Sequence, residues 1–127
     1  MTYRISKEFA FSASHQLRGL HEGHPCARLH GHNYVVRVEL ASDRLDSTGF
    51  VLDYSALKPF GAWLDAHLDH RHLNEAFPGS NPTAETLART LAGVLADVVA
   101  LPDGAQVAVS VSETPKTWAT WTFGALQ

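Results

Sequence analysis

The sequence has only one cysteine, Cys26, and little net charge, and each shortage excludes a class of protein. A single cysteine cannot form an internal disulfide, so we expect a reducing, cytoplasmic setting. The formal net charge is −3 and no run of basic residues occurs, which argues against a surface for nucleic acid or another polyanion.

Long apolar stretches are missing as well. No segment approaches the ~20 residues that cross a bilayer, and Met1–Ile5 does not open a signal peptide. We therefore expect neither membrane insertion nor secretion. The length of 127 residues predicts a single domain over residues 1–127. Its 45% hydrophobic residues suffice for a core, and oligomerisation is a common way to cover the surface that remains.

Alternation of apolar and polar residues predicts two strands in the first third of the chain. Over residues 3–15 one apolar face ends with a histidine, and over residues 31–41 a second apolar face begins with one. These faces carry Tyr3, Ile5, Phe9, Phe11, Ala13 and His15, and His32, Tyr34, Val36, Val38 and Leu40. The glycines and the proline between the strands indicate an irregular loop over residues 16–29.

Two helices are expected next. After a short extended piece at residues 50–52, Asp53 or Ser55 can cap the first, and Thr83 can cap the second beyond a loop at residues 74–82. Their buried stripes would be Leu57, Phe60, Leu64 and Leu68, and Leu87, Leu91, Val94, Leu95 and Val98.

Two further strands, over residues 107–113 and 117–123, close the chain around a turn that contains Pro115. The order β-β-α-α-β-β contains no spacing for a parallel crossover. It therefore predicts an α+β fold, with a four-stranded antiparallel sheet and both helices on one side.

Histidine is in surplus, with eight in the chain, and most lie within residues 21–32 and 67–72. His30 and His32 project from the same strand face with only a glycine between them, and His15 ends the neighbouring strand on its apolar side. Two imidazoles from one strand and a third from the next can converge on a metal ion with one position left open. That is the composition of a catalytic zinc site.

The alternatives to this metal site stay open at this point. A single histidine is more often a satisfied core or surface residue, and a rival pair, His21 and His24, lies in a loop that would hold a metal less rigidly. Cys26, four residues before His30, would alone be an inert buried side chain. Beside a divalent cation its thiolate is favoured, and it becomes a candidate base or nucleophile.

Two acidic positions have similar double interpretations. Asp69-His70 follows the first helix, where cationic groups suit the helix dipole, but a carboxylate next to an imidazole can also orient it for proton transfer. Glu113 continues the apolar face of a valine-rich strand, where a lone buried carboxylate would cost several kcal/mol. It either reaches solvent or meets a donor-rich partner, such as the adjacent N–H groups of a pterin or guanine ring.

Taken together, these residues resemble the 6-pyruvoyltetrahydropterin synthase / 6-carboxytetrahydropterin synthase family over essentially the whole chain. The combination of Cys-x3-His-Gly-His, an upstream His and a downstream Asp-His is specific. The matching segments are Phe11-Ser12-Ala13-Ser14-His15, residues 22–34 around Cys26 and His30-Gly31-His32, Gly49–Tyr54, Leu68-Asp69-His70, Asn81-Pro82-Thr83-Ala84-Glu85 and Ser112-Glu113-Thr114-Pro115.

The resemblance implies a tunnelling fold, in which subunits join sheet edges into a barrel. It implies a homohexamer, built as a dimer of trimers, with active sites at subunit interfaces. It also implies Zn²⁺ as the cofactor, held by His15, His30 and His32.

The remaining roles are implied by the same resemblance. Cys26 would abstract a proton, with Asp69 and His70 as a proton-relay pair. Glu113 would anchor the pterin, and Thr83 and Glu85 would line its pocket. The chain departs from the animal pyruvoyl enzymes at Ala84, where they have a hydroxyl residue.

The implied substrate is 7,8-dihydroneopterin triphosphate, and the implied enzyme is a zinc-dependent lyase. The short chain and the loop around Cys26 favour the bacterial branch, which makes 6-carboxytetrahydropterin, acetaldehyde and triphosphate on the way to queuosine and other 7-deazapurines. The pyruvoyl synthase is the alternative, and a non-catalytic zinc-binding module is an alternative of another class. A third branch has Glu where Cys26 stands, so the cysteine counts against it. Arg28, Arg71 and Lys116 are candidates for holding the triphosphate.

Overall fold

One five-stranded sheet, in the order β3-β1-β2-β4-β5, organises the chain. The computed structural model describes residues 1–124. The strands are β1 Tyr3–His15, β2 His30–Ser42, β3 Arg71–His72, β4 Gln106–Ser112 and β5 Ala119–Phe123. The helices are α1 Lys58–His67, α2 Leu73–Ala76 and α3 Ala84–Val98, with 3₁₀ turns at Pro25–Ala27 and Tyr54–Leu57.

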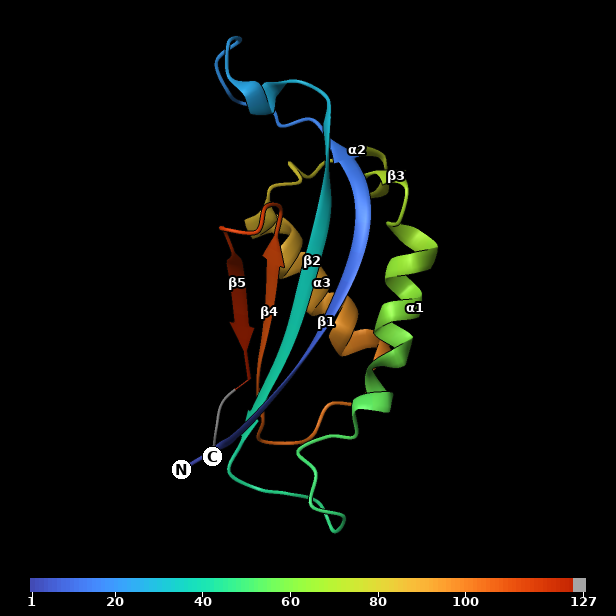
Figure 1. Cartoon of the computed structure of the whole chain (residues 1–127), viewed down its shortest axis with the longest axis vertical. Coiled ribbons are helices and arrows are strands. Elements are labelled where there is room, and N and C mark those ends of the chain that lie inside the picture. Colours follow the sequence, from blue (N-terminus) through green and yellow to red (C-terminus); the bar gives the residue numbers. More distant parts are fainter. Residues whose placement is uncertain (125–127) are drawn as a thin grey trace.

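The predicted α+β architecture is confirmed. β1 pairs antiparallel with β2, β2 with β4 and β4 with β5. Figure 1 shows α3 crossing one face of the sheet and α1 running beside it along β1. One apolar face of the strands and the apolar stripes of α1 and α3 form a single buried core.

Alternation explains why β1 and β2 form the centre of this sheet. Tyr34 and Val36 on β2 are fully buried, and Phe11 on β1 stacks on Tyr34 with ring centroids 5.0 Å apart. The β1–β2 ladder runs in unbroken register from Tyr3 opposite Ser42 to the last pair, His15 opposite His30. That register fixes which side chains share the core face, since a slip of one residue would turn all of them over.

Helix α3 begins as predicted. The Thr83 side chain accepts a hydrogen bond from the Thr86 N–H, and the Thr86 side chain accepts one from the Thr83 N–H, which completes a capping box. Asp53, in contrast, caps the 3₁₀ turn through the Ser55 N–H, and α1 itself begins only at Lys58. Proline at residue 59 is tolerated because it falls in the first turn of α1, where its missing N–H has no helical partner.

Several local predictions were wrong. The sheet is mixed, because the two-residue strand β3 pairs parallel with β1 at Ala13 and Ser14 as a fifth strand. Residues 50–52 form no strand, residues 74–76 of the expected loop belong to the short helix α2, and the last strand begins at Ala119. These pieces are too short for a periodic pattern, so the contacts of their neighbours decide their conformation.

The ends of three strands and one helix lie together at one end of the sheet. The C-terminal end of β1, the N-terminal end of β2, the N-terminus of α3 and the C-terminal end of β4 lie there, beneath the loop of residues 16–29 (Figure 1). Within residues 1–124, no helix has the length and apolar character needed to cross a membrane.

Candidate metal centre and active site

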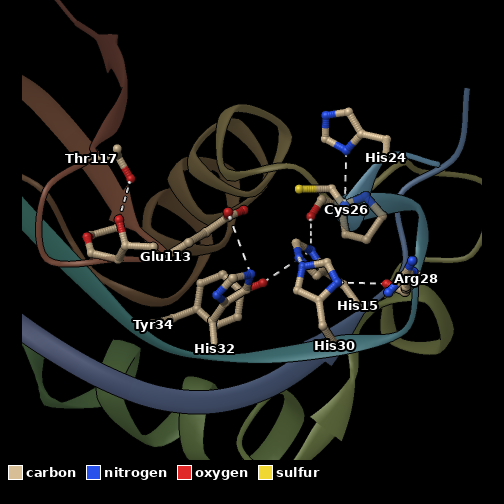
Figure 2. A network of polar contacts seen from close by, with 12 residues as sticks. His15, His24, Cys26, Arg28, His30, His32, Tyr34, Glu113 and Thr117 are labelled. Carbon is tan, nitrogen blue, oxygen red and sulfur yellow. Dashed lines mark hydrogen bonds and ion pairs between the residues drawn. The ribbon is translucent and has the colours of Figure 1, made fainter. Parts of the chain in front are cut away.

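Three imidazoles converge at this end of the sheet. His15 and His30 face each other as the last pair of the β1–β2 ladder, and His32 follows two residues along β2 on the same face. One ring nitrogen from each lies within 4.8 Å of the others. Figure 2 shows the three rings gathered side by side, as the strand pairing predicts.

Backbone carbonyls fix the tautomers of two of these rings. The Nδ1–H of His15 donates to the Pro82 carbonyl oxygen at 2.7 Å, and the Nδ1–H of His30 donates to the Arg28 carbonyl oxygen at 2.7 Å. In the neutral rings both Nε2 atoms then carry lone pairs, yet they lie 2.9 Å apart. Two lone pairs at that distance repel unless a cation lies against both, and a carbonyl on Nδ1 is the usual support of a metal-ligating histidine.

The third ring presents an unpaired nitrogen. The buried Nε2 of His32 has no hydrogen-bond partner among the described residues, and Oε2 of Glu113 lies 3.7 Å from it. A buried polar atom without a partner is costly, which points to a further species at that position. Three imidazole nitrogens with space for one more ligand suit a tetrahedral zinc ion, so the residues present fit that metal.

Burial favours the uncharged form of two of these rings. It lowers the pKa of His15 and that of His32, while the Glu113 carboxylate opposes the shift in each. Metal ions bind the neutral imidazole, so the lowered pKa values favour ligation. Tyr34 lies under the cluster, with its hydroxyl 3.2 Å from Nδ1 of His15, and burial raises the pKa of that hydroxyl, which therefore stays protonated.

Cys26 stands beside the cluster in the 3₁₀ turn Pro25–Ala27, half-buried and without a disulfide. Its N–H donates to Nδ1 of His24 at 3.0 Å, and its carbonyl accepts from the Leu17 N–H at 3.0 Å. Figure 2 shows the thiol pointing toward the side on which Glu113 lies. His24 thus supports the cysteine turn. In the described part of the chain, only His15, His30 and His32 bring three such ligand atoms together.

Glu113, Thr83 and Glu85 lie around one cavity of about 520 Å³. Glu113 follows the last residue of β4, and Thr83 and Glu85 flank the start of α3. The structure therefore brings the three predicted residues together around one cavity, and Glu113 among them lies 3.7 Å from His32.

Asp69 and His70 form a close pair away from the Glu113 cavity. Oδ1 of Asp69 accepts the Ser12 N–H at 2.9 Å, and Oδ2 lies 2.9 Å from Nδ1 of His70. The Ser12 N–H and then the His70 side chain lower the pKa of the Asp69 carboxyl. The His70 side chain is 83% exposed in a hollow that it shares with Ser12 and Asn33, on the sheet face opposite His15. Within one chain the pair does not join Cys26.

Comparison with known proteins identifies a family. The family model described as 6-pyruvoyl tetrahydropterin synthase matches residues 4–123. The chain belongs to this family. A 6-carboxy-5,6,7,8-tetrahydropterin synthase from Synechocystis is 49% identical over 92 residues, which are 66% of this chain and 67% of the relative. One from Bacillus subtilis is 32% identical over 96 residues, 71% of this chain and 63% of that protein.

Solved structures of family members share the fold. A 6-pyruvoyl tetrahydropterin synthase from Caenorhabditis elegans aligns with a TM-score of 0.77 and 25% identity, over 98% of this chain and 96% of that one. The Plasmodium vivax enzyme of the same name aligns with a TM-score of 0.77 and 21% identity over 98% and 99%, which is a likeness of fold alone.

The sequence prediction missed the groups that support the three histidines. Tyr34 was placed only in the core, although it lies on the same strand face as His32 and alternation could have linked them. The carbonyls of Arg28 and Pro82 leave no signal in a sequence. Of the triphosphate candidates, Arg71 donates to the Ala66 carbonyl at 3.2 Å, at the C-terminal end of α1.

Proposed function

We propose that this chain is a zinc-dependent 6-carboxytetrahydropterin synthase. It would convert 7,8-dihydroneopterin triphosphate and water to 6-carboxytetrahydropterin, acetaldehyde and triphosphate, a step toward queuosine and other 7-deazapurines. The observation that carries the proposal is the convergence of His15, His30 and His32 between Cys26 and the Glu113 cavity. Family membership and the names of two relatives support it. The cytoplasmic location expected for a free thiol belongs to the same proposal.

The pterin ring would bind in the cavity beside α3. The Glu113 carboxylate can accept two neighbouring N–H groups of the ring, and such charge-assisted pairs are about twice as strong as neutral ones. Thr83 and Glu85 would complete the ring's surroundings from the start of the helix. The cavity adjoins the three histidines, because the Glu113 carboxylate is 3.7 Å from the His32 imidazole.

The three histidines would hold Zn²⁺ at the substrate side chain. Bound there, the metal would supply Lewis acidity toward the side-chain hydroxyl oxygens and make the adjacent carbon a stronger acid. Tyr34 and the Pro82 carbonyl keep the His15 ring in one orientation, so its Nε2 stays directed at the cluster.

Cys26 would take the proton from a side-chain carbon of the substrate as thiolate. Asp69 would orient His70 through the 2.9 Å contact to Nδ1, which leaves Nε2 of that ring to carry a proton to or from the substrate. Because this pair faces away from Cys26 in its own chain, we propose that it acts on the substrate held by a neighbouring copy. A homohexamer, as a dimer of trimers, is the assembly expected.

The test is incubation of the purified zinc-loaded protein with 7,8-dihydroneopterin triphosphate, followed by mass analysis of the pterin and assay of acetaldehyde. We expect 6-carboxytetrahydropterin with stoichiometric acetaldehyde. Release of 6-pyruvoyltetrahydropterin without acetaldehyde would instead identify the pyruvoyl activity. If no pterin changes and chelation of the metal unfolds the chain, the zinc site is structural. Light scattering on the same sample tests the hexamer.

A further inference from the structure

The chain continues beyond β1 without a strand partner on either side. The ladder with β2 ends at His15 and His30, and β3 covers β1 only at Ala13 and Ser14. Residues 16–18 nevertheless begin the loop that carries Cys26. Their backbone groups need partners if the loop is to keep one position over the metal centre.

Two asparagine side chains supply these partners on one edge. Oδ1 of Asn74 accepts the Gln16 N–H at 2.9 Å, and its Nδ2 donates to the Gln16 carbonyl at 2.8 Å. Asn81 does the same for Arg18, at 2.8 Å from the N–H and 3.0 Å to the carbonyl. A side-chain amide has the donor and acceptor of a peptide group, so the two asparagines replace the strand that β3 does not continue.

The opposite edge of the same segment holds the cysteine turn. The Leu17 N–H donates to the Cys26 carbonyl at 3.0 Å, and Nε2 of Gln16 donates to the Ala27 carbonyl at 3.0 Å. In an extended segment the backbone groups of alternate residues point to the same edge. Gln16 and Arg18 therefore face the asparagines while Leu17 faces Cys26, and the segment links the two.

Asn81 also stands where three parts of the site meet. The next residue, Pro82, holds the His15 ring through its carbonyl, and Thr83 after it caps α3 and lines the Glu113 cavity. The bond from Asn81 to Arg18 thus fixes the cysteine loop relative to the metal centre and the cavity. The asparagine bonds lie in exposed surroundings, where each adds little stability.

We propose that Asn74 and Asn81 are positioning residues, whose paired amide contacts hold Cys26 over the substrate bound at the metal centre. The inference rests on the proposed function for the role of Cys26. It can be tested separately from that function, because the position of the Cys26 loop can be measured in the absence of turnover. An error of about 1 Å in the position of a reacting group can cost ~100-fold in rate.

The experiment compares Asn74→Ala, Asn81→Ala and the double variant with the wild-type holoenzyme. For the double variant we expect kcat to fall roughly 100-fold with KM little changed, since the pterin cavity keeps its residues. Zinc content should stay at the wild-type value. Amide hydrogen exchange of Leu17 should speed up, and the rate of Cys26 alkylation by iodoacetamide should change, both in the absence of substrate.

Asp46→Ala is the matched control. Its Oδ1 accepts the N–H groups of Thr48 and Phe50, each at 2.9 Å, in a loop at the other end of the sheet. The control therefore loses two side-chain-to-backbone bonds of the same kind without touching the Cys26 loop. Asn74→Asp and Asn81→Asp keep the oxygen that accepts the N–H, but they lose the donor and place a negative charge beside the carbonyl oxygen. Leu17 exchange and kcat should therefore both depart from wild type.

Three results would overturn the inference. In the first, Leu17 exchange, alkylation and kcat of the alanine variants match those of the Asp46→Ala control. In the second, zinc is lost together with kcat, which would place the effect at the metal centre. The third applies if the alanine variants do not fold. In that case, Leu17 exchange and kcat equal to wild type in both aspartate variants would overturn the inference. A wild-type protein without turnover would sink the proposed function, whereas exchange and alkylation would still test the asparagine contacts.

Discussion

The free energy of unfolding of the metal-free protein should fall as the pH falls from 7 to 5. Burial lowers the pKa of His15 and of His32 from 6.5 in the folded chain, whereas both rings titrate normally once unfolded. Below pH 6.5 the unfolded chain therefore binds more protons, and stability is lost until the folded pKa is passed. The contribution is fully present above pH 6.5.

The slope can be bounded from the structure. Each ring contributes at most about 1.4 kcal/mol per pH unit in that window, so two rings contribute at most about 2.7 kcal/mol per pH unit. The limit is not reached, because Glu113 raises both pKa values and the His32 side chain is 18% exposed. Hydrogen bonds lower the pKa of Asp53 and of Asp69 from 3.8, so their contribution is lost only as the pH falls below that value. The window from 5 to 7 therefore reports on the histidines.

Urea unfolding of chelator-treated protein at half-unit pH steps measures this slope. His32→Gln should flatten it by removing one buried ring, and His67→Gln, at an exposed position, should leave it unchanged. Zinc at 100 times its Kd should add about 2.7 kcal/mol at a given pH. A metal-free protein equally stable at pH 5 and pH 7 would refute the view that the rings are buried uncharged.

Four substitutions test the rest of the site and the core. Glu113→Gln should lower kcat/KM about 10- to 100-fold, because a charge-assisted hydrogen bond is worth about 1.5–3 kcal/mol; steady-state rates at normal zinc content check it, and an unchanged ratio would contradict the pterin anchor. Cys26→Ala should abolish turnover while metal analysis finds the zinc unchanged, and near wild-type turnover would remove the thiol from the mechanism. Asp69→Asn keeps an acceptor for the Ser12 N–H but loses the charge beside His70, so kcat should fall by roughly 100-fold. A pH–rate profile identical to that of wild type would show that Asp69 takes no part in proton transfer. Leu64→Ala empties a fully buried position and should cost about 2–5 kcal/mol in urea unfolding, with kcat per folded molecule kept; a smaller loss would mean that the core closes around the gap.

The sequence predicts a helix or strand correctly where its pattern of apolar residues repeats several times. Alternation over 13 residues placed β1 and set His15 on the core face. A threonine before a regular leucine stripe placed the start of α3. Both signals are local, and the packing of the same residues against one another strengthens them.

Prediction failed where a long-range contact decides a short segment. His70 has a φ of 59°, a conformation that a non-glycine residue rarely adopts unless its contacts hold it there. Its N–H donates to the Ser12 carbonyl at 2.6 Å. That turn sends the chain back along β1 and creates β3 from two residues. Likewise, the Asn-Pro at residue 81 indicates a turn, but no spacing shows that its side chain pairs with Arg18.

The same turn limits how copies of the chain can join. Ser12 uses its N–H for Asp69 and its carbonyl for His70, and β3 covers Ser14, so the free edge of β1 lies along residues 4–10. The other free edge is β5, whose start lines the Glu113 cavity. The pairings make β1 and β5 antiparallel, so joining the two edges would continue the sheet. Because β5 begins at the end of the sheet where His70 lies, such a joint would bring the Asp69–His70 pair of one copy beside the Glu113 cavity of the next, where the proposed chemistry needs it.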